Sequence, residues 1–419
     1  MTTIEAAMRV PAAGTGGAPL RARALVEGPR PGSGASAHRE GGAGRLIAVD
    51  AARGLAMLLV FLAHFLDAYL RPLGGEPEQL RQKLHLVTRL ASPSFMLISG
   101  LMLGLLYTRR RGDFGPTRSR LQRRGLFLIT VGHLLIVPTY LSWVDEAGHL
   151  VRILFVTDTI GVAMIVGPLL VTRLGARARA ALGGALFAGS WALSLGVTST
   201  QPVARLLEEV LFGHVVQSVL FSNFPLVPWF GVFLAGSAVG EWFGDKLQAG
   251  QTLQAARRFV KVGGSLFATG MVLLGAYVWL RRSGGAHLPE GLASALGALT
   301  SPKQKFPPGP AYLLLYGGLG LTGLGLLIRA EQAGRLGRLL RPASLLGRHS
   351  LLAFLLQFYV YYLGVYYARL PYSRLWPLLF AATVVAQWLL LRAWDAHERR
   401  SVSPARVLVP SSASVSPAP

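Results

Sequence analysis

Long apolar stretches separated by short polar segments dominate the sequence. Each stretch holds about 20 mostly apolar residues, the length of an α-helix that crosses the hydrocarbon core of a bilayer. A chain inside a bilayer must satisfy its backbone hydrogen bonds internally, so the pattern predicts helices. We therefore predict an all-α membrane protein, a bundle of about ten transmembrane helices. The predicted spans are 46–70, 86–107, 124–143, 151–172, 179–198, 224–243, 259–280, 310–329, 344–367 and 374–394.

Basic residues gather in alternate connecting segments, the distribution that the positive-inside rule describes. The first of these segments, 109–124, is dense in arginine, whereas the segments on the opposite side are mixed or acidic. This alternation predicts that both termini face the cytoplasm of a multi-pass protein in the cell membrane. One outer segment departs from the pattern, because it carries Arg281, Arg282, Lys303 and Lys305. We expect this segment, 281–310, to border an acceptor site.

Composition agrees with the membrane class. The chain is 52% hydrophobic and only 15% charged, too apolar for a soluble protein of this size. Its net charge of +23 could indicate nucleic-acid binding, but the basic residues lie in short runs between apolar spans. We therefore expect contact with membrane lipid and not with nucleic acid. The chain has no cysteine, which excludes disulfides, cysteine-ligated zinc and a cysteine nucleophile, and we expect no metal cofactor.

The ends of the chain differ from its centre. Residues 1–44 contain no apolar run and many Gly, Ala and Pro, so we expect a disordered cytoplasmic tail rather than a cleavable signal peptide. Residues 396–419 are polar and rich in Ser and Pro, and we expect a second disordered cytoplasmic tail. A single membrane domain, 45–395, lies between them.

The first span is unusual because it carries a stripe of polar residues. A charged side chain at membrane depth costs at least about 2.5 kcal/mol, so such residues are typically functional or paired. At 100° per residue, the four residues fall within roughly a 100° arc of one helix face. Two interpretations follow: a catalytic or binding stripe, or a membrane-entry flank followed by one packed histidine. The residues are Asp50, Arg53, His64 and Asp67.

Further polar residues lie in or beside the next three spans. His85 and Arg89 lie near the outer end of the second span, where we expect the Arg89 side chain to extend to the interface. His133 lies in the third span. Asp158 lies in the fourth and needs a partner, either in a structural ion pair or in the site.

Four short motifs resemble those of the membrane acyltransferase superfamily, which includes the acyltransferase-3 proteins and the heparan-alpha-glucosaminide N-acetyltransferase-like proteins. The resemblance runs from about residue 45 to the ninth span. Phe354 and Gln357 depart from it, since relatives often have tyrosine and histidine there. The motifs are Asp50-Ala-Ala-Arg53-Gly54 with His64 eleven residues after the arginine, Pro93-Ser-Phe-Met-Leu-Ile-Ser99-Gly100, Arg123-Arg124-Gly125 and Phe224-Pro-Leu-Val-Pro-Trp229-Phe-Gly231.

The resemblance implies transfer of an acyl group from cytoplasmic acyl-CoA to a glycan or other small acceptor outside the cytoplasm. Acetyl is the first candidate for this group. Acyl transfer needs a base for the acceptor proton, and a histidine serves near neutral pH. A histidine can alternatively carry the acyl group itself. His64 is the first candidate and His85 the second. For the donor phosphates we expect Arg53, Arg123 and Arg124, and for structural or orienting roles Asp50, Asp67 and Asp158.

Several alternatives stay open. Asp67 could orient an imidazole or lie among the lipid headgroups, and the arginines of 109–124 could fix topology alone. Asp50, Arg53, His64 and Asp158 could form the relay of a proton-coupled transporter. The polar stripe could also be packed inside a non-catalytic scaffold. Whether copies of the chain associate as a homo-oligomer is equally open.

Overall fold

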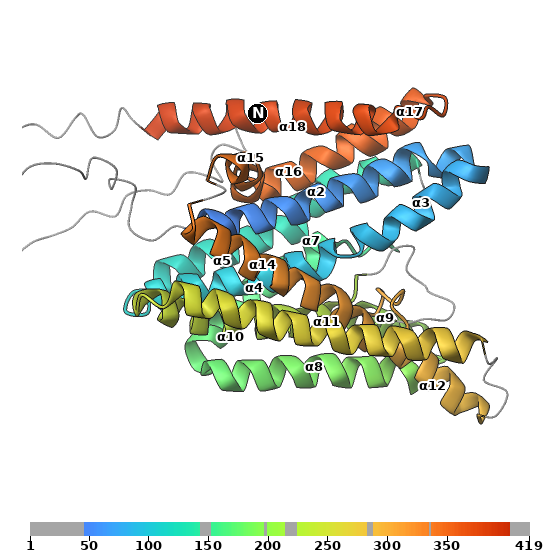
Figure 1. Ribbon diagram of the computed structural model, residues 1–419, viewed down its shortest axis with the longest axis horizontal. Coiled ribbons are helices and arrows are strands. Elements are labelled where there is room, and N and C mark those ends of the chain that lie inside the picture. Colours follow the sequence, from blue (N-terminus) through green and yellow to red (C-terminus); the bar gives the residue numbers. More distant parts are fainter. Residues whose placement is uncertain are drawn as a thin grey trace, which may run out of the picture. The chain divides into compact units, whose positions relative to one another are not determined.

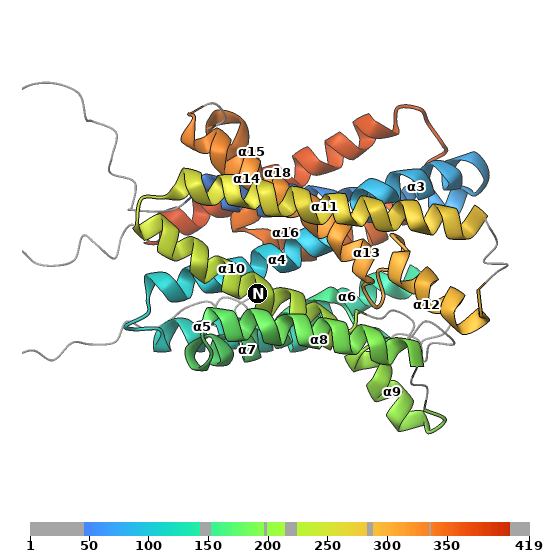
Figure 2. The same cartoon turned by 60° about the horizontal axis from the view of Figure 1, so that its bottom comes forward.

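The computed structural model describes residues 46–142, 152–196, 199–213, 224–282, 288–334 and 337–402. These ranges contain helices and no β-strand. The predicted N-terminal tail, 1–44, lies outside the described residues, as does the C-terminal tail from residue 403 onward. The long helices run side by side in both views of the bundle (Figures 1 and 2), whereas the short helix α9 (Pro202–Leu211) projects from it in Figure 2.

Helices follow one another along the whole described chain, and three of them contain or adjoin π-helical turns. The elements up to residue 211 are α2 (Ile47–Tyr69), η1 (Arg71–Leu73), α3 (Gly75–Thr88), α4 (Ala91–Arg109), α5 (Gly115–Phe127), η2 (Leu128–Gly132), α6 (His133–Ile136), η3 (Val137–Ser142), α7 (Val156–Arg173), α8 (Ala176–Gly196) and α9 (Pro202–Leu211). The later elements are α10 (Leu226–Gln248), α11 (Thr252–Arg282), α12 (Glu290–Thr300), α13 (Pro310–Tyr312), η5 (Leu313–Gly317), α14 (Gly318–Gln332), α15 (Gly337–Arg348), α16 (Ser350–Phe358), η6 (Tyr359–Val365), α17 (Tyr366–Ala368) and α18 (Trp376–Val402).

Nine helices within the described residues are long and apolar enough to cross a membrane, which confirms the all-α membrane class. They correspond to nine of the ten predicted spans. The tenth prediction, 179–198, falls on α8, a helix of 21 residues that is not among the nine. Arg177 and Arg179 occupy its first turn, and the helix packs along α10.

Several predicted connecting segments are helical. Residues 75–88 form α3, a separate helix that turns back beside the end of α2 (Figure 1). Gly74 makes this reversal possible, because its φ of 65° lies in the region that other residues avoid. In the arginine-rich segment, α5 begins at Gly115 with Pro116 in its first turn, where the missing N–H of proline costs no hydrogen bond. The outer segment 281–310 contains α12.

The helix α2 contacts α3, α4, α14, α15, α16 and η6, so the polar stripe is surrounded by protein. Its first turn is held by Glu331 at the end of α14. The two carboxylate oxygens accept hydrogen bonds from the backbone N–H groups of Ile47 at 2.9 Å and Ala48 at 2.8 Å. A carboxylate at a helix N-terminus satisfies unpaired N–H groups and favours the helix dipole.

Glycines set how closely α15 approaches α2. A Cβ added to Gly54 would lie 1.8 Å from the backbone oxygen of Ala343, and one added to Gly347 would lie 1.8 Å from that of Asp50. Only a residue without a side chain permits this approach, which is the reason small residues dominate contacts between membrane helices. The separation of α2 and α15 therefore depends on these two glycines.

We expect Gly54→Ala to lower the thermal midpoint of the protein in detergent by several degrees. The added methyl group must push α15 away, and such overpacking costs about 1–3 kcal/mol. The measurement is thermal unfolding followed by intrinsic tryptophan fluorescence. Gly264→Ala in α11 is the control, because no atom lies within 4 Å of its added Cβ. Equal midpoints for the two variants would contradict the packing argument.

Candidate functional site

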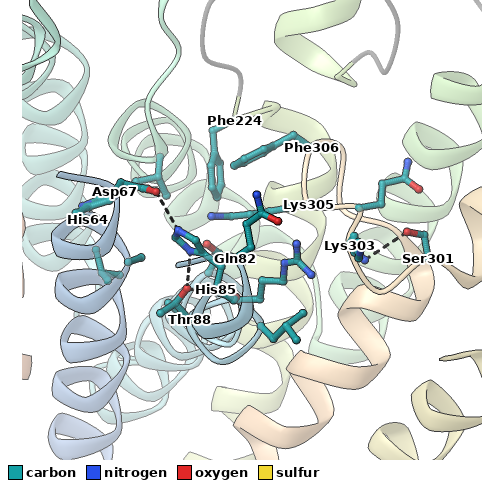
Figure 3. A pocket seen from close by; sticks show the side chains of 18 of the residues that line it. His64, Asp67, Gln82, His85, Thr88, Phe224, Ser301, Lys303, Lys305 and Phe306 are labelled. Carbon is teal, nitrogen blue, oxygen red and sulfur yellow. Dashed lines mark hydrogen bonds and ion pairs between the residues drawn. The ribbon is translucent and has the colours of Figure 1, made fainter. Parts of the chain in front are cut away.

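A cavity of about 1570 Å³ lies beside the second half of α2, and Figure 3 shows part of its lining. On α2 the lining extends from Val60 to Asp67. Further parts of the wall come from α3, α4, η3, α7, α8, α11, α12, α16 and residues 301–306. The predicted outer segment thus borders this cavity. Its volume exceeds that of a typical small-molecule pocket, so two substrates could occupy it together.

His64 lies in the wall of this cavity with its two ring nitrogens in different surroundings. Nδ1 lies 2.7 Å from Oε1 of Gln357, a fully buried side chain on α16. The ring also packs on Phe358 and Tyr362, with centroids 4.9 and 5.4 Å apart. Nε2 has no hydrogen-bond partner among the described residues. One nitrogen is therefore held by protein and the other is available to a ligand.

His85 lines the same cavity, but both of its ring nitrogens are engaged. Nε2 lies 2.9 Å from Oδ1 of Asp67, and Nδ1 lies 3.0 Å from Oγ1 of Thr88 (Figure 3). The same Asp67 oxygen accepts a hydrogen bond from Nη1 of Arg81 at 2.5 Å. Of the two interpretations of Asp67, contact with an imidazole is therefore the one that the structure shows. α3 creates this contact by folding back against α2.

Arg53 lies outside the cavity lining but contacts one of its residues, Phe95. Its guanidinium carbon is 5.4 Å from the centre of the Phe95 ring, and Phe95 is part of the cavity lining. Its Nε is buried and has no hydrogen-bond partner among the described residues. Arg124 is close enough for its like charge to act on Arg53, while Arg123 and Arg124 are exposed on α5. These three residues are not part of the cavity lining.

The two remaining predicted acids lie outside the cavity lining. Asp50 is buried in the first turn of α2, where α15 crosses closely at Gly347. Asp158 accepts a hydrogen bond from Nδ1 of His133 at 2.9 Å and one from the backbone N–H of Phe155 at 2.8 Å. The second bond caps the start of α7. These contacts give Asp158 a structural partner on the third span.

The cavity is also lined by basic side chains. The sequence predicted another position for one of them, Arg89, and did not single out some of the others. Arg89 was expected to extend to the interface. That prediction is wrong, because its Nη1 is buried beside the cavity and has no partner among the described residues. Basic residues outnumber the single acid, Asp67, in the lining, which contains Arg81, Lys83, Arg89, Arg281, Lys303 and Lys305.

Lys305 reaches the cavity from the segment that follows α12. Its Nζ lies 4.9 Å from the centre of the Phe306 ring. Burial lowers the pKa of the Lys305 amine to about 8, and the nearby Asp67 carboxylate opposes that shift. Residues 301–306 carry no motif. Only their basic side chains, which depart from the positive-inside pattern, indicated in the sequence that this segment borders a site. Within the described part of the chain, no cluster of three or more His, Asp and Glu residues could hold a metal ion.

A sequence model described as "Heparan-alpha-glucosaminide N-acetyltransferase, catalytic" matches residues 45–279. This stretch is more than half of the chain and includes His64, Asp67 and His85, but it ends before Lys305 and Gln357. No curated protein matches the chain.

We expect Lys305 to react with amine reagents with a midpoint near pH 8. Only the neutral amine is nucleophilic, and an amine with the ordinary pKa of 10.5 would be almost fully protonated at that pH. Competitive labelling with trace acetic anhydride, quantified by peptide mass spectrometry, measures the midpoint. Asp67→Asn should move it further down, because the carboxylate that favours the charged form is removed. A Lys305 midpoint near pH 10 would contradict this environment.

Proposed function

The chain belongs to the heparan-alpha-glucosaminide N-acetyltransferase family, and from this premise we propose which donor, acceptor and side chains this membrane acyltransferase uses. Acetyl-CoA binds from the cytoplasm, and the acetyl group passes to a glycan or other small acceptor in the cavity around His64. The donor is a co-substrate, and the residues proposed to act on it are this chain's own.

One observation carries the choice of His64. Its Nδ1 is held by Gln357, whereas Nε2 has no hydrogen-bond partner among the described residues, and His64 lines the cavity. In the proposed reaction Nε2 takes the proton of the acceptor amine or hydroxyl as that group attacks the thioester carbonyl. The new bond to the acyl carbon forms, the carbon–sulfur bond breaks, and CoA leaves as the thiolate. A neutral imidazole is suited to this proton transfer near pH 7.

His85 ranks second for a geometric reason. With Nε2 bonded to Asp67 and Nδ1 to Thr88, its imidazole would have to give up a contact before it could accept a proton. The same contacts, together with Arg81, join α3 to α2. We assign His85 to shaping the wall of the cavity that faces the acceptor.

The donor is proposed to lie along the first helix. Arg53 and His64 are on one continuous helix, α2, and eleven residues separate them by about 16 Å. Coenzyme A is long, with a charged nucleotide at one end and the thioester at the end of a flexible arm. Arg53 and Arg124 would face the phosphates, for which a guanidinium is well suited. Phe95 contacts the Arg53 guanidinium, lines the cavity and would border the arm.

The acceptor is proposed to enter from the opposite end of the bundle. The segment 301–306 and α12 supply much of that part of the lining. The excess of basic residues there favours an acceptor with acidic groups, because a cleft lined by one sign of charge attracts the other. A transporter or a scaffold would use the same polar stripe without releasing free CoA, so turnover separates these classes.

We expect the purified protein to release CoA thiol from acetyl-CoA, and His64→Ala to lower kcat by at least about 100-fold. General-base catalysis contributes about 10²–10⁴-fold, whereas donor binding does not need the imidazole. A thiol reagent follows the release without background, because the chain has no cysteine. His397→Ala, an exposed histidine on α18, is the control. Full turnover in His64→Ala with loss in His85→Ala would transfer the role to His85.

We expect Arg53→Ala to raise the KM for acetyl-CoA about 10-fold or more with little change in kcat, since a charge-assisted hydrogen bond contributes about 1.5–3 kcal/mol. Arg53→Lys should restore only part of the affinity. Acetyl-pantetheine lacks the nucleotide, so its KM should not respond to either variant. Arg338→Ala, at an exposed arginine of α15, is the control. Normal acetyl-CoA binding by Arg53→Ala would instead indicate a structural pair with Asp50, three residues earlier.

A further inference from the structure

The contact between Gln357 and His64 has a consequence for the chemistry of the imidazole. We propose that Gln357 is a positioning residue that holds His64 in the tautomer with the proton on Nδ1, so that Nε2 is the basic atom in the cavity. The inference rests on the proposed function, in which His64 is the base. Gln357 itself touches neither substrate in this assignment.

Nδ1 of His64 has one hydrogen-bond partner among the described residues, the side chain of Gln357. Oε1 of Gln357 lies 2.7 Å from it, a short distance for a hydrogen bond to nitrogen. An amide oxygen can only accept, so Nδ1 must carry the proton and donate it. The neutral ring has one proton on its nitrogens, and Nε2 is then left with its lone pair. The reverse orientation of the amide would place N–H on Nε2, where the ring could not take a proton.

The surroundings of Gln357 hold it in place. Its side chain is fully buried, and it precedes the π-helical turns of η6, a kind of irregularity that frequently occurs at functional sites. Phe358 on the same helix packs on the His64 ring at 4.9 Å and limits its rotation. The amide nitrogen of Gln357 is buried without a hydrogen-bond partner among the described residues. Leaving a buried donor unsatisfied costs about 1–3 kcal/mol.

The two histidines of the cavity differ in their partners, and this difference explains why the partner of His64 is an amide. His85 is bound to the carboxylate of Asp67, and a carboxylate stabilises an imidazolium. Gln357 orients its imidazole to the same degree but adds no charge. Two histidines in one cavity therefore have partners of different charge. The uncharged partner, Gln357, contacts His64, whose Nε2 has no hydrogen-bond partner among the described residues.

Other titratable groups surround His64 and must be considered in any pH experiment. Asp67 is on its own helix, His85 on α3 and Lys305 on the segment after α12, and the charges of all three act on His64. The Tyr362 ring of η6 packs on His64, and the Tyr140 ring of η3 packs on Tyr362 with a centroid distance of 5.5 Å. These groups are the same in all Gln357 variants, so differences between the variants report on position 357.

The test compares Gln357→Glu with Gln357→Leu in the full-length protein. Glutamate keeps an acceptor at Nδ1 and adds a charge, so the acidic limb of the kcat/KM profile should move up by about 1 pH unit. Its kcat at pH 9 should stay within about threefold of wild type. Leucine removes the acceptor, so kcat should fall by about 100-fold at every pH while the KM for acetyl-CoA is unchanged.

The control is Gln387→Leu. Gln387 is also fully buried, and its amide donates a hydrogen bond to Tyr361 on η6 at 3.0 Å rather than contacting His64. Its loss should lower the thermal midpoint as much as Gln357→Leu does and leave the pH profile unmoved. If Gln357→Glu is as inactive as Gln357→Leu at every pH, or if its acidic limb does not move, the proposal is overturned.

A second measurement does not depend on turnover. Diethyl pyrocarbonate reacts with the neutral imidazole, and peptide mass spectrometry gives the pH midpoint for His64 alone. We expect this midpoint to rise in Gln357→Glu by the same amount as the acidic limb. A shifted midpoint in a protein that never releases CoA would refute the proposed function and leave the role of Gln357 intact. Turnover with an unshifted midpoint would refute the role of Gln357 instead.

Discussion

A charged or polar side chain in the apolar interior of a membrane must find its partner within the protein, because no water is available to it. This constraint determines the surroundings of α2. Its start is held by Glu331, its aspartate near the far end pairs with Arg81 and His85, and its histidine bonds to Gln357. The elements that provide these partners, α14, α3 and α16, pack against α2. Pairing the polar groups of this one helix therefore brings distant parts of the sequence together.

The nature of each α2 side chain could be predicted from the sequence, but its partner could not. Periodicity placed His64 and Asp67 on one face, since a helix repeats every 3.6 residues. Asp67 meets His85 only because the chain reverses at Gly74 and continues as α3. Helical periodicity carries no information about such a reversal. Gln357 lies 293 residues from His64, and in the sequence it was visible only as a departure from the family pattern.

The spans themselves were predictable because the bilayer imposes their length. The segments between spans were not, because water allows both loops and helices there. Lys305 is an example of a residue whose position could not be predicted for this reason. Its segment was expected to border an acceptor site from its charge alone, but its place in the cavity wall depends on how residues 301–306 fold after α12. The site thus combines the family-matched part, 45–279, with side chains contributed by the rest of the chain.

The cavity lining covers only part of α2, and this bears on how the membrane remains a barrier to ions. Along α2 its lining starts at Val60, seven residues or roughly 10 Å beyond Arg53, and Phe95, which the Arg53 guanidinium contacts, is part of that lining. A cell whose ion gradients drive its energy metabolism can tolerate a large aqueous chamber in its membrane only when that chamber is closed at one end. In the proposed reaction the donor itself would occupy the interval between Arg53 and the cavity, so a bound donor rather than open water would join the two sides of the membrane.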